Sequence, residues 1–208
     1  MILGLGDCNM GGAEGFDGKT YIELVGQALG MEWVNRGITM STTREGVILR
    51  KEYEEPDILV IGYGLVDSWK TFKYAPYVLY YPDNPLRKLG RKLVKKYKKI
   101  ARSLGLNEIL GQKYVVPPKE YETNIEYMLQ QAKRVFLVET PPHHRQHFRN
   151  PDIKRYNDIL RSIAQRHEHV SLVAIYDELA CAKRFYLDDI HLNQAGYDLI
   201  ARKILEQL

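Results

Sequence analysis

The residue most able to do covalent chemistry is a cysteine near the start of the chain. Cys8 follows the apolar run Ile2–Leu5 and the pair Gly6-Asp7. In an open α/β sheet, ligands bind beyond the carboxyl ends of the strands. A short side chain directly after a strand can project into that binding cleft. A thiol there becomes a nucleophile if a nearby imidazole lowers its pKa. Cys8 is therefore a candidate nucleophile, and the alternative is a small, buried apolar residue.

A candidate base lies near the other end of the sequence. His191 comes three residues after Asp188, directly before a segment with helical periodicity. An aspartate at this spacing can hold one ring nitrogen of the imidazole and leave the other nitrogen to take a proton. The same Asp-x-x-His run can instead form only a helix cap. Cys8, His191 and Asp188 thus predict a nucleophile, a general base and its orienting carboxylate.

Strands and helices must hold these residues at one edge of a sheet. Short apolar runs, which suit buried parallel strands, alternate with segments of helical periodicity. This order predicts an α/β fold, a three-layer α/β/α sandwich with a mainly parallel central sheet. The predicted strands are Ile2–Leu5, Met31–Val34, Ile58–Tyr63, Val135–Val138 and Val170–Ile175. The predicted helices are Lys19–Leu29, Leu86–Leu104, Tyr121–Arg134, Pro151–Arg166 and Gln194–Leu208, with a loop at Asn107–Pro118.

Length and composition limit the class of protein. The chain has 208 residues, 45% of them hydrophobic and 27% charged, which suits one well-buried globular core. We expect a single domain over residues 1–208 with a basic helical insertion around residues 84–118. No apolar run reaches the roughly 20 residues of a transmembrane segment. The start of the chain predicts a strand and not a signal peptide, so two free thiols in the cytoplasm are expected.

Taken in order, these motifs resemble those of the SGNH/GDSL hydrolase superfamily over nearly the whole chain. The family's Gly-Asp-Ser after the first strand corresponds to Gly6–Cys8, and its Asp-x-x-His corresponds to Asp188–His191. Its Asn-x-x-x-x-Gly corresponds to Asn35–Met40, and its Gly-x-Asn-Asp to Gly64–Asp67. The resemblance implies the SGNH-hydrolase (flavodoxin-like) fold. It also implies hydrolysis or transfer of acyl groups on esters, without a metal or an organic cofactor.

The resemblance assigns a role to each motif residue. It casts Cys8 as the nucleophile, His191 as the general base and Asp188 as the residue that orients the base. Groups near Cys8 are implied to bind the oxyanion and the substrate. These groups belong to Asp7, Gly37, Met40, Gly64, Val66 and Asp67.

The sequence departs from the family pattern at three positions. Cysteine replaces the nucleophilic serine, Met40 replaces the glycine of the second motif, and Val66 replaces the asparagine of the third. A thiolate is still a nucleophile, and Gly37 can take over from Met40 as the backbone donor. The loss at Val66 is larger, because removing one oxyanion donor lowers kcat by about 10²–10³. Asp67 is expected to be ionised and therefore to donate no hydrogen bond.

The segment from Arg87 to Arg102 is strongly basic and amphipathic. It contains nine Lys and Arg residues, with apolar residues at three- and four-residue steps. Either the apolar stripe faces the core and the cationic side faces solvent, or the helix binds an anionic partner. Phospholipid headgroups, a lipid-linked sugar phosphate and an acidic polysaccharide are such partners. Nucleic acid is not expected, because no nucleic-acid-binding motif accompanies the charge.

Two smaller clusters allow more than one interpretation. Tyr74, Tyr77, Tyr80 and Tyr81 can stack on sugar rings or pack against one another. The histidines of His143–His147 have no companion Cys or Glu at a recognisable spacing, so no metal site is expected.

Together the motifs predict an acyl-ester hydrolase or O-acyltransferase that acts on a small-molecule or glycan ester. The carbohydrate or polysaccharide part rests on the tyrosines and the basic helix. The alternative is a catalytically silent module of the same fold that binds an anionic or acylated glycan. An activated Cys8 that alkylates rapidly at neutral pH would favour the enzyme.

Overall fold

In the computed structural model, which describes residues 1–53 and 55–208, the centre is a five-stranded sheet. Its strand order is β2-β1-β3-β6-β7, and every neighbouring pair is parallel. The carboxyl ends of all these strands therefore share one edge. The strands are β1 (Ile2–Gly6), β2 (Trp33–Gly37), β3 (Ile58–Gly62), β6 (Arg134–Val138) and β7 (Val170–Val173).

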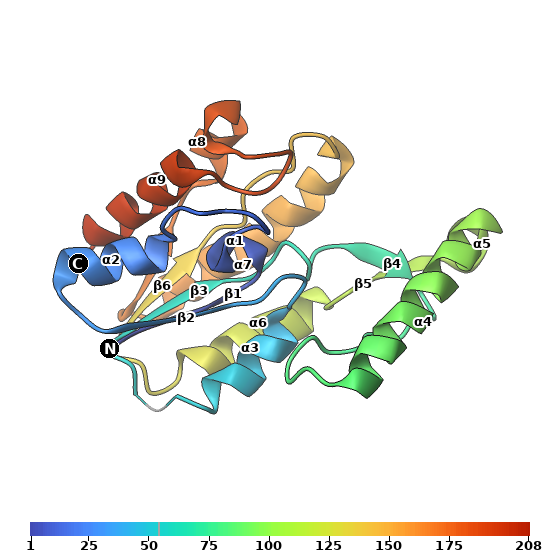
Figure 1. Ribbon diagram of the computed structural model, residues 1–208, viewed down its shortest axis with the longest axis horizontal. Coiled ribbons are helices and arrows are strands. Elements are labelled where there is room, and N and C mark those ends of the chain that lie inside the picture. The colour runs from blue at the N-terminus through green and yellow to red at the C-terminus, as the bar shows by residue number, and fades with distance from the viewer. Residues whose placement is uncertain (54) are drawn as a thin grey trace.

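Helices cover both faces of the sheet (Figure 1). Successive residues of a strand point to opposite faces. In β1, Ile2 packs in the core beneath α2 and α9, whereas Leu3 and Leu5 pack in the core beneath α3, α6 and α7. The fold is therefore the predicted three-layer sandwich. The helices are α2 (Tyr21–Leu29), α3 (Thr43–Arg50), α6 (Pro118–Leu129), α7 (Asn150–Arg166) and α9 (Gln194–Leu205).

The structure differs from the predictions in the bounds of several elements and in one additional helix. The strand predicted at Met31–Val34 starts later, because the chain first closes α2 through a left-handed Gly30. The helix predicted at Tyr121–Arg134 begins three residues earlier, since proline suits the first turn of a helix, and it ends at Leu129. Helix α3 is unpredicted, although Thr42 and Glu45 form a capping box at its start.

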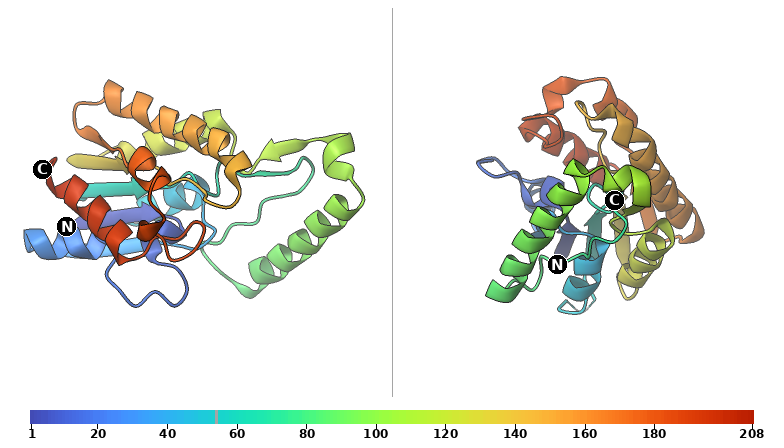
Figure 2. Two further views of the ribbon diagram at one scale, coloured as in Figure 1. Left: turned by 90° about the horizontal axis from the view of Figure 1, so that it is seen from above. Right: turned by 90° about the vertical axis from the view of Figure 1, so that its right-hand side faces the viewer.

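Residues 70–114 form an arm that projects from the sandwich (Figures 1 and 2). Strands β4 (Lys70–Phe72) and β5 (Gln112–Tyr114) pair in an antiparallel manner at its base. Helices α4 (Pro85–Ser103) and α5 (Leu106–Leu110) form the rest of the arm. The prediction of a loop over Asn107–Pro118 is therefore wrong, because this stretch includes the end of α5 and all of β5.

The apolar stripe of α4 does not face the core. Leu86 is 81% exposed and Leu93 is 60% exposed, and Ala101 is the one buried residue of the helix. Of the two alternatives for this helix, the one with a core-facing stripe is therefore wrong. Within residues 1–53 and 55–208, no helix is long and apolar enough to cross a membrane.

The remaining short elements lie in the segments that follow β1, β6 and β7 along the chain. They are α1 (Cys8–Gly11), α8 (Tyr176–Ala180) and the 3₁₀ turns His147–Arg149 and Lys183–Phe185.

Candidate active site

Cys8 is the first residue of α1 and lies directly beyond the carboxyl end of β1. Asp7 caps α1, since its Oδ1 accepts a hydrogen bond of 2.9 Å from the backbone N–H of Asn9. Gly6, the last residue of β1, pairs with Gly37 on one side and with Gly62 on the other. The loops after β1, β2 and β3 therefore meet, and they bring the first three motifs together.

The side chain of Cys8 lies in an apolar environment. The residue is 6% exposed and packs with Leu65, Ile153 and Tyr176. Burial raises the pKa of the Cys8 thiol, and the negative charge of Asp7 acts in the same direction. The thiol is therefore uncharged at neutral pH, and its attack on a carbonyl carbon requires a base. Rapid alkylation is no longer the expected behaviour of this cysteine.

His191 and Asp188 form a direct pair. His191 Nδ1 lies 2.7 Å from Asp188 Oδ2, and Asp188 Oδ1 accepts 2.8 Å hydrogen bonds from the backbone N–H groups of Ile190 and His191. Partial burial opposes ionisation of Asp188, but the hydrogen bonds from His191 and Ile190 outweigh it and lower the pKa of the carboxyl. With Nδ1–H donating to this carboxylate, Nε2 is left as the proton acceptor.

A tight turn presents this pair. Tyr186 and Leu192 form an antiparallel bridge, and Leu187 N–H donates to the carbonyl of His191 over 2.8 Å. Ile190, inside the turn, packs against the apolar cluster that contains Cys8. Cys8 and His191 both belong to the described residues, and no hydrogen bond joins the Cys8 thiol to the imidazole.

The second motif keeps the backbone conformation of a glycine. Met40 has a φ of 67°, in the left-handed region that favours glycine. Its turn is attached to β1, because Ile38 N–H and the Ser41 hydroxyl both donate to the carbonyl of Gly6, each over 3.0 Å. Gly37 cannot replace Met40 as the backbone donor, since its N–H already donates to the side chain of Asn35 over 2.9 Å.

The third motif differs more from the prediction. Gly64 has a φ of 140°, and a Cβ there would lie 2.3 Å from Thr140 Oγ1, so only glycine fits. Val66 is buried in the core beneath α3, α6 and α7 and supplies no polar group. Leu65, one residue earlier, is the member of this motif that packs with Cys8.

Asp67 is fully buried and connects the loop after β3 to the start of α3. Its Oδ1 accepts hydrogen bonds from the backbone N–H and the hydroxyl of Thr43, over 2.9 and 2.7 Å. Burial raises the pKa of Asp67 to about 7, against the lowering effect of these bonds. Burial, together with the charge of Asp67, raises the pKa of Asp7 to about 7 as well. Asp67, which we expected to be ionised, is therefore ionised only in part at neutral pH.

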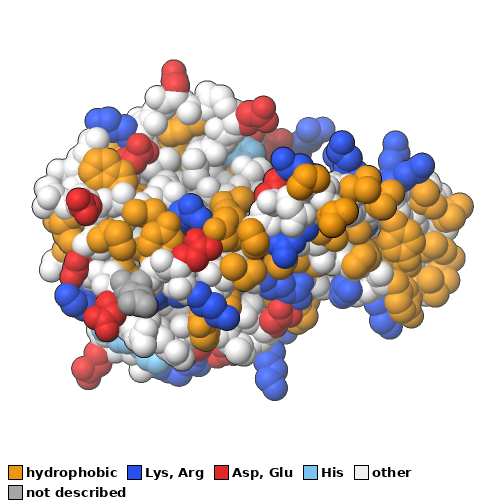
Figure 3. Space-filling model, turned by 60° about the horizontal axis from the view of Figure 1, so that its bottom comes forward, with side chains coloured by type: hydrophobic (Ala, Val, Ile, Leu, Met, Phe, Trp, Pro, Cys, Tyr) orange, Lys and Arg blue, Asp and Glu red, His pale blue; other side chains and the backbone are white. Residues whose placement is uncertain are grey.

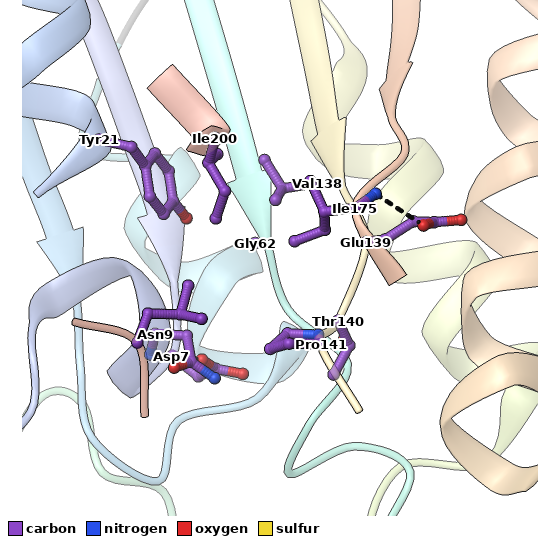
Figure 4. Close-up of a pocket in the computed structure, with 11 residues that line it drawn as sticks. Asp7, Asn9, Tyr21, Gly62, Val138, Glu139, Thr140, Pro141, Ile175 and Ile200 are labelled. Atoms are coloured by element: carbon purple, nitrogen blue, oxygen red, sulfur yellow. Dashed lines mark hydrogen bonds between the residues drawn. The ribbon is translucent and has the colours of Figure 1, made fainter. Parts of the chain in front are cut away.

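A small cavity of about 10 Å³ lies beneath this edge of the sheet. Asp7 and Asn9 lie side by side in it and face Thr140 and Pro141, while Glu139 points away toward Ile175 (Figure 4). The cavity has room for about one water molecule and none for an ester substrate.

Sequence reasoning missed two polar residues of this region. Asn9 is 6% exposed, and neither atom of its side-chain amide has a hydrogen-bond partner among the described residues. Thr43 holds Asp67. The capping box at the start of α3 could have identified the Thr43 region. The polar Asn9, directly after Cys8, gave no distinctive signal.

The two ambiguous clusters have mainly structural contacts. Tyr77 donates to Glu45, Tyr81 donates to Glu52, and the guanidinium of Arg91 lies 4.7 Å from the ring centroid of Tyr80. Tyr74, the fourth member of the tyrosine cluster, is mostly exposed.

His143 accepts backbone hydrogen bonds at its Nδ1 from Arg145 and Gln146. In the part of the chain that the structure describes, no three His, Cys, Asp or Glu side chains are grouped to hold a metal ion.

The fold and the site together define a three-layer α/β/α sandwich with its candidate residues at the carboxyl edge of a parallel sheet. The chain belongs to the GDSL-like lipase/acylhydrolase family, whose model matches residues 5–199. This membership confirms the family resemblance of the motifs. No curated protein matches the sequence.

Solved structures share this fold over the whole chain. An α/β hydrolase enzyme from the metagenome of Lake Arreo, Spain, has a TM-score of 0.63 and 20% identity, covering 99% of this chain and 93% of its own. The acetylxylan esterase of Geobacillus stearothermophilus has a TM-score of 0.63 and 20% identity, with 99% and 92% covered. A member of the lipolytic G-D-S-L family from Veillonella parvula has a TM-score of 0.62 and 15% identity, with 99% and 96% covered.

Proposed function

We propose that this chain is an acyl-ester hydrolase in which Cys8 is the nucleophile, His191 the general base and Asp188 its orienting carboxylate. The observation that carries the proposal is the 2.7 Å contact between Asp188 Oδ2 and His191 Nδ1. The turn that holds this pair packs through Ile190 against the cluster around Cys8. Family membership supports the reaction class.

The buried, uncharged thiol determines how the first step proceeds. As Cys8 Sγ attacks the carbonyl carbon of the ester, His191 Nε2 takes the thiol proton, so no free thiolate is needed beforehand. The resulting imidazolium is stabilised by the carboxylate of Asp188. The tetrahedral intermediate collapses, the imidazolium gives its proton to the departing alkoxide, and the acyl group remains on sulfur as a thioester.

The second step returns the enzyme to its starting state. A water molecule attacks the thioester carbon while His191 takes one of its protons, and the carboxylic acid leaves as the proton returns to Cys8 sulfur. If a sugar hydroxyl attacks in place of water, the same residues carry out acyl transfer. The proposed roles of Cys8, His191 and Asp188 are the same for either acceptor.

Two backbone N–H groups near β1 are available for the developing oxyanion. The N–H groups of Cys8 and Met40 have no acceptor among the described residues, whereas those of Gly37 and Asn9 are already bonded. Val66, at the position of the family's asparagine, lies in the core and supplies no side-chain donor. We therefore expect slow turnover, about 10²–10³ below that of an enzyme with a complete set of donors.

For the substrate we propose a short acyl ester of a carbohydrate. The neighbours of the Cys8 thiol are apolar, which suits an acyl group better than a charged group. One of the structural neighbours is an acetylxylan esterase, which supports a glycan ester as the class to test first.

The decisive experiment is turnover of short-chain p-nitrophenyl esters and acetylated xylo-oligosaccharides by wild type, Cys8→Ser, Cys8→Ala and His191→Ala. Loss of activity by at least about 10³ in Cys8→Ala and His191→Ala would support the triad. Activity only in Cys8→Ser would show that the site retains its machinery and that sulfur suppresses it. Full activity in Cys8→Ala would overturn the assignment of the nucleophile.

A second candidate function is a silent module that binds acylated glycans. The raised pKa of the buried Cys8 thiol and the apolar Val66 both favour it. Burial makes slow alkylation the expected result for either function, so alkylation cannot separate them. Binding of acetylated xylo-oligosaccharides without turnover, in wild type and in Cys8→Ser alike, would identify the binding module.

A further inference from the structure

The arm carries an apolar stripe that the described residues leave largely exposed. Leu86, Leu93 and Leu104 of the arm are 81%, 60% and 62% exposed, and α5 adds Ile109 at 74%. The stripe also includes Leu89, Tyr97 and Ile100, all of them exposed. The space-filling view shows these apolar side chains gathered on the projecting end, with Lys and Arg around them (Figure 3). Exposed apolar surfaces of this kind mark interaction sites.

The contacts between α4 and its own polypeptide lie mainly on a neighbouring side of the helix, and Tyr97, at the edge of the stripe, packs edge-on against Phe72. Arg91 donates to the carbonyl of Leu79 and to Asp83, and Gly90 faces Val78. Ala101 belongs to the small cluster at the base of the arm. These contacts hold α4 with its stripe turned outward, so exposure of the stripe follows from how the arm is folded.

The charge of α4 identifies the chemistry of its partner. The helix has nine Lys and Arg residues and no Asp or Glu. Within the described residues only Lys88 and Arg91 form ion pairs, both with Asp83. Of the other seven basic side chains, Arg87 donates to the carbonyl of Pro82 and Lys98 is half-buried, and the remaining five are exposed to an external anionic surface. A helix with one apolar and one cationic face is the kind that lies in the interface of an anionic bilayer.

We propose that α4 and α5 dock this protein on the surface of an anionic lipid bilayer. The leucines of the stripe enter the boundary between headgroups and acyl chains, and the lysines beside them contact the lipid phosphates. The arm lies in the plane of the interface and does not cross the bilayer, since α4 is too highly charged to do so. The proposal does not depend on the function of Cys8.

A second copy of the chain is a less suitable occupant. Pairing two stripes would bring two α4 helices together, each with nine basic residues and no acidic residue. Such like-charge contact opposes association, whereas an anionic bilayer neutralises the same charge and also buries the leucines.

The test is co-sedimentation of the full chain with phosphatidylcholine vesicles that contain or lack phosphatidylglycerol. We expect binding only to the anionic vesicles, and loss of that binding when the salt concentration is raised to about 0.5 M. Cys8→Ala should bind as wild type does. Absence of binding to anionic vesicles, or equal binding to neutral ones, would overturn the proposal.

Two sets of variants separate the contributions of charge and stripe. Each basic residue at an anionic surface contributes about fivefold in affinity, so Lys92→Gln, Lys95→Gln and Lys96→Gln together should weaken binding by about 100-fold. Leu89→Ser with Leu93→Ser should weaken it by at least about tenfold. All five side chains are exposed, so the fold should be unaffected.

Matched controls place the same changes outside the arm. Lys51→Gln, Lys119→Gln and Lys183→Gln remove the same net charge from exposed positions, and Leu29→Ser with Leu208→Ser removes two exposed leucines. Both controls should bind within about twofold of wild type. If the charge control weakens binding as much as the arm variant, the arm is not the docking element.

A direct readout comes from Leu93→Trp. Its added fluorescence should shift to the blue on anionic vesicles and be quenched by brominated acyl chains. Analytical ultracentrifugation of wild type and the leucine variant tests whether a second copy of the chain binds the stripe instead. A wild-type dimer that this variant converts to monomer would assign the stripe to a second copy and overturn membrane docking.

Discussion

At the scale of single residues, the site combines a well-oriented base with a poorly activated nucleophile. Asp188 contacts the ring of His191 and accepts hydrogen bonds from the backbone N–H groups of Ile190 and His191. Cys8, in contrast, lies among apolar side chains where burial keeps the thiol protonated. Any reaction at Cys8 must therefore be driven by proton transfer to the imidazole at the moment of attack.

Asp188→Asn tests this dependence on the base. An asparagine can turn the imidazole so that Nε2 carries the hydrogen, and kcat should fall by about 10³–10⁴ with little change in KM. The rate of ester hydrolysis is measured for the substitution in the wild-type protein or in Cys8→Ser, whichever of the two hydrolyses the substrate. Asp189→Asn is the matched control, since among the described residues the carboxylate of Asp189 makes only a 4.0 Å contact with Arg145. Equal effects of the two substitutions would contradict the role of Asp188.

Met40 allows a stability test of the left-handed position. At a φ of 67° a side chain is strained and glycine is not. Met40→Gly and Met40→Ala remove nearly the same side-chain packing. The difference between their free energies of unfolding therefore measures the backbone strain at this position. We expect the glycine variant to be more stable by about 1 kcal/mol in urea unfolding. A more stable alanine variant would show that the turn changes conformation after substitution.

At the scale of elements, the base of the arm is attached to α3 through one buried carboxylate. Glu45 accepts hydrogen bonds from the backbone and hydroxyl of Thr42, from the hydroxyl of Tyr77 and from Tyr80 N–H. This arrangement explains why Tyr77 is packed and not free to stack on a sugar. It also couples the arm to the helix that carries Thr43.

Tyr77→Phe should therefore destabilise the protein by about 1–3 kcal/mol, because it removes a hydrogen bond to a buried charged group. Tyr74→Phe is the control, since Tyr74 is 59% exposed. Thermal or urea unfolding of both variants measures the difference. Equal stability of the two variants would show that the Glu45 network does not hold the arm.

At the scale of the whole molecule, the buried carboxyls make stability depend on pH. Asp67 has a pKa of about 7 in the folded chain and near 3.8 when exposed. The folded state therefore holds this proton more tightly. The resulting stabilisation is complete below pH 4 and is lost as the pH rises toward and through 7. Asp7 contributes in the same direction.

Asp67→Asn should weaken this dependence, because asparagine cannot ionise and its oxygen can still accept the bonds from Thr43. Between pH 5 and pH 8 the wild type should lose on the order of 2 kcal/mol more stability than the variant. Urea unfolding across this range measures the difference, and Asp17→Asn, at an exposed site, should behave as wild type. Parallel curves for wild type and Asp67→Asn would contradict a raised pKa at Asp67.

Much of the fold follows from local sequence patterns. Apolar runs such as Ile58–Tyr63 and helical periodicity such as that of Gln194–Leu208 depend on neighbouring residues, so their order already predicts a parallel sandwich. The motif spacing likewise places Cys8 after a strand and His191 before a helix. The short elements α3, β4 and β5 were missed, because their stability depends on tertiary contacts more than on their own pattern.

The sequence by itself determined the fold class, the family and the identity of the candidate triad, since these depend on residue order and spacing. Tertiary structure alone decided the state of each group. Whether Cys8 is charged, whether Gly37 has a free amide and whether Asp67 is ionised all depend on burial and on partners distant in the chain. The outward direction of the α4 stripe was decided in the same way, because an amphipathic pattern specifies two faces but not which one meets the protein.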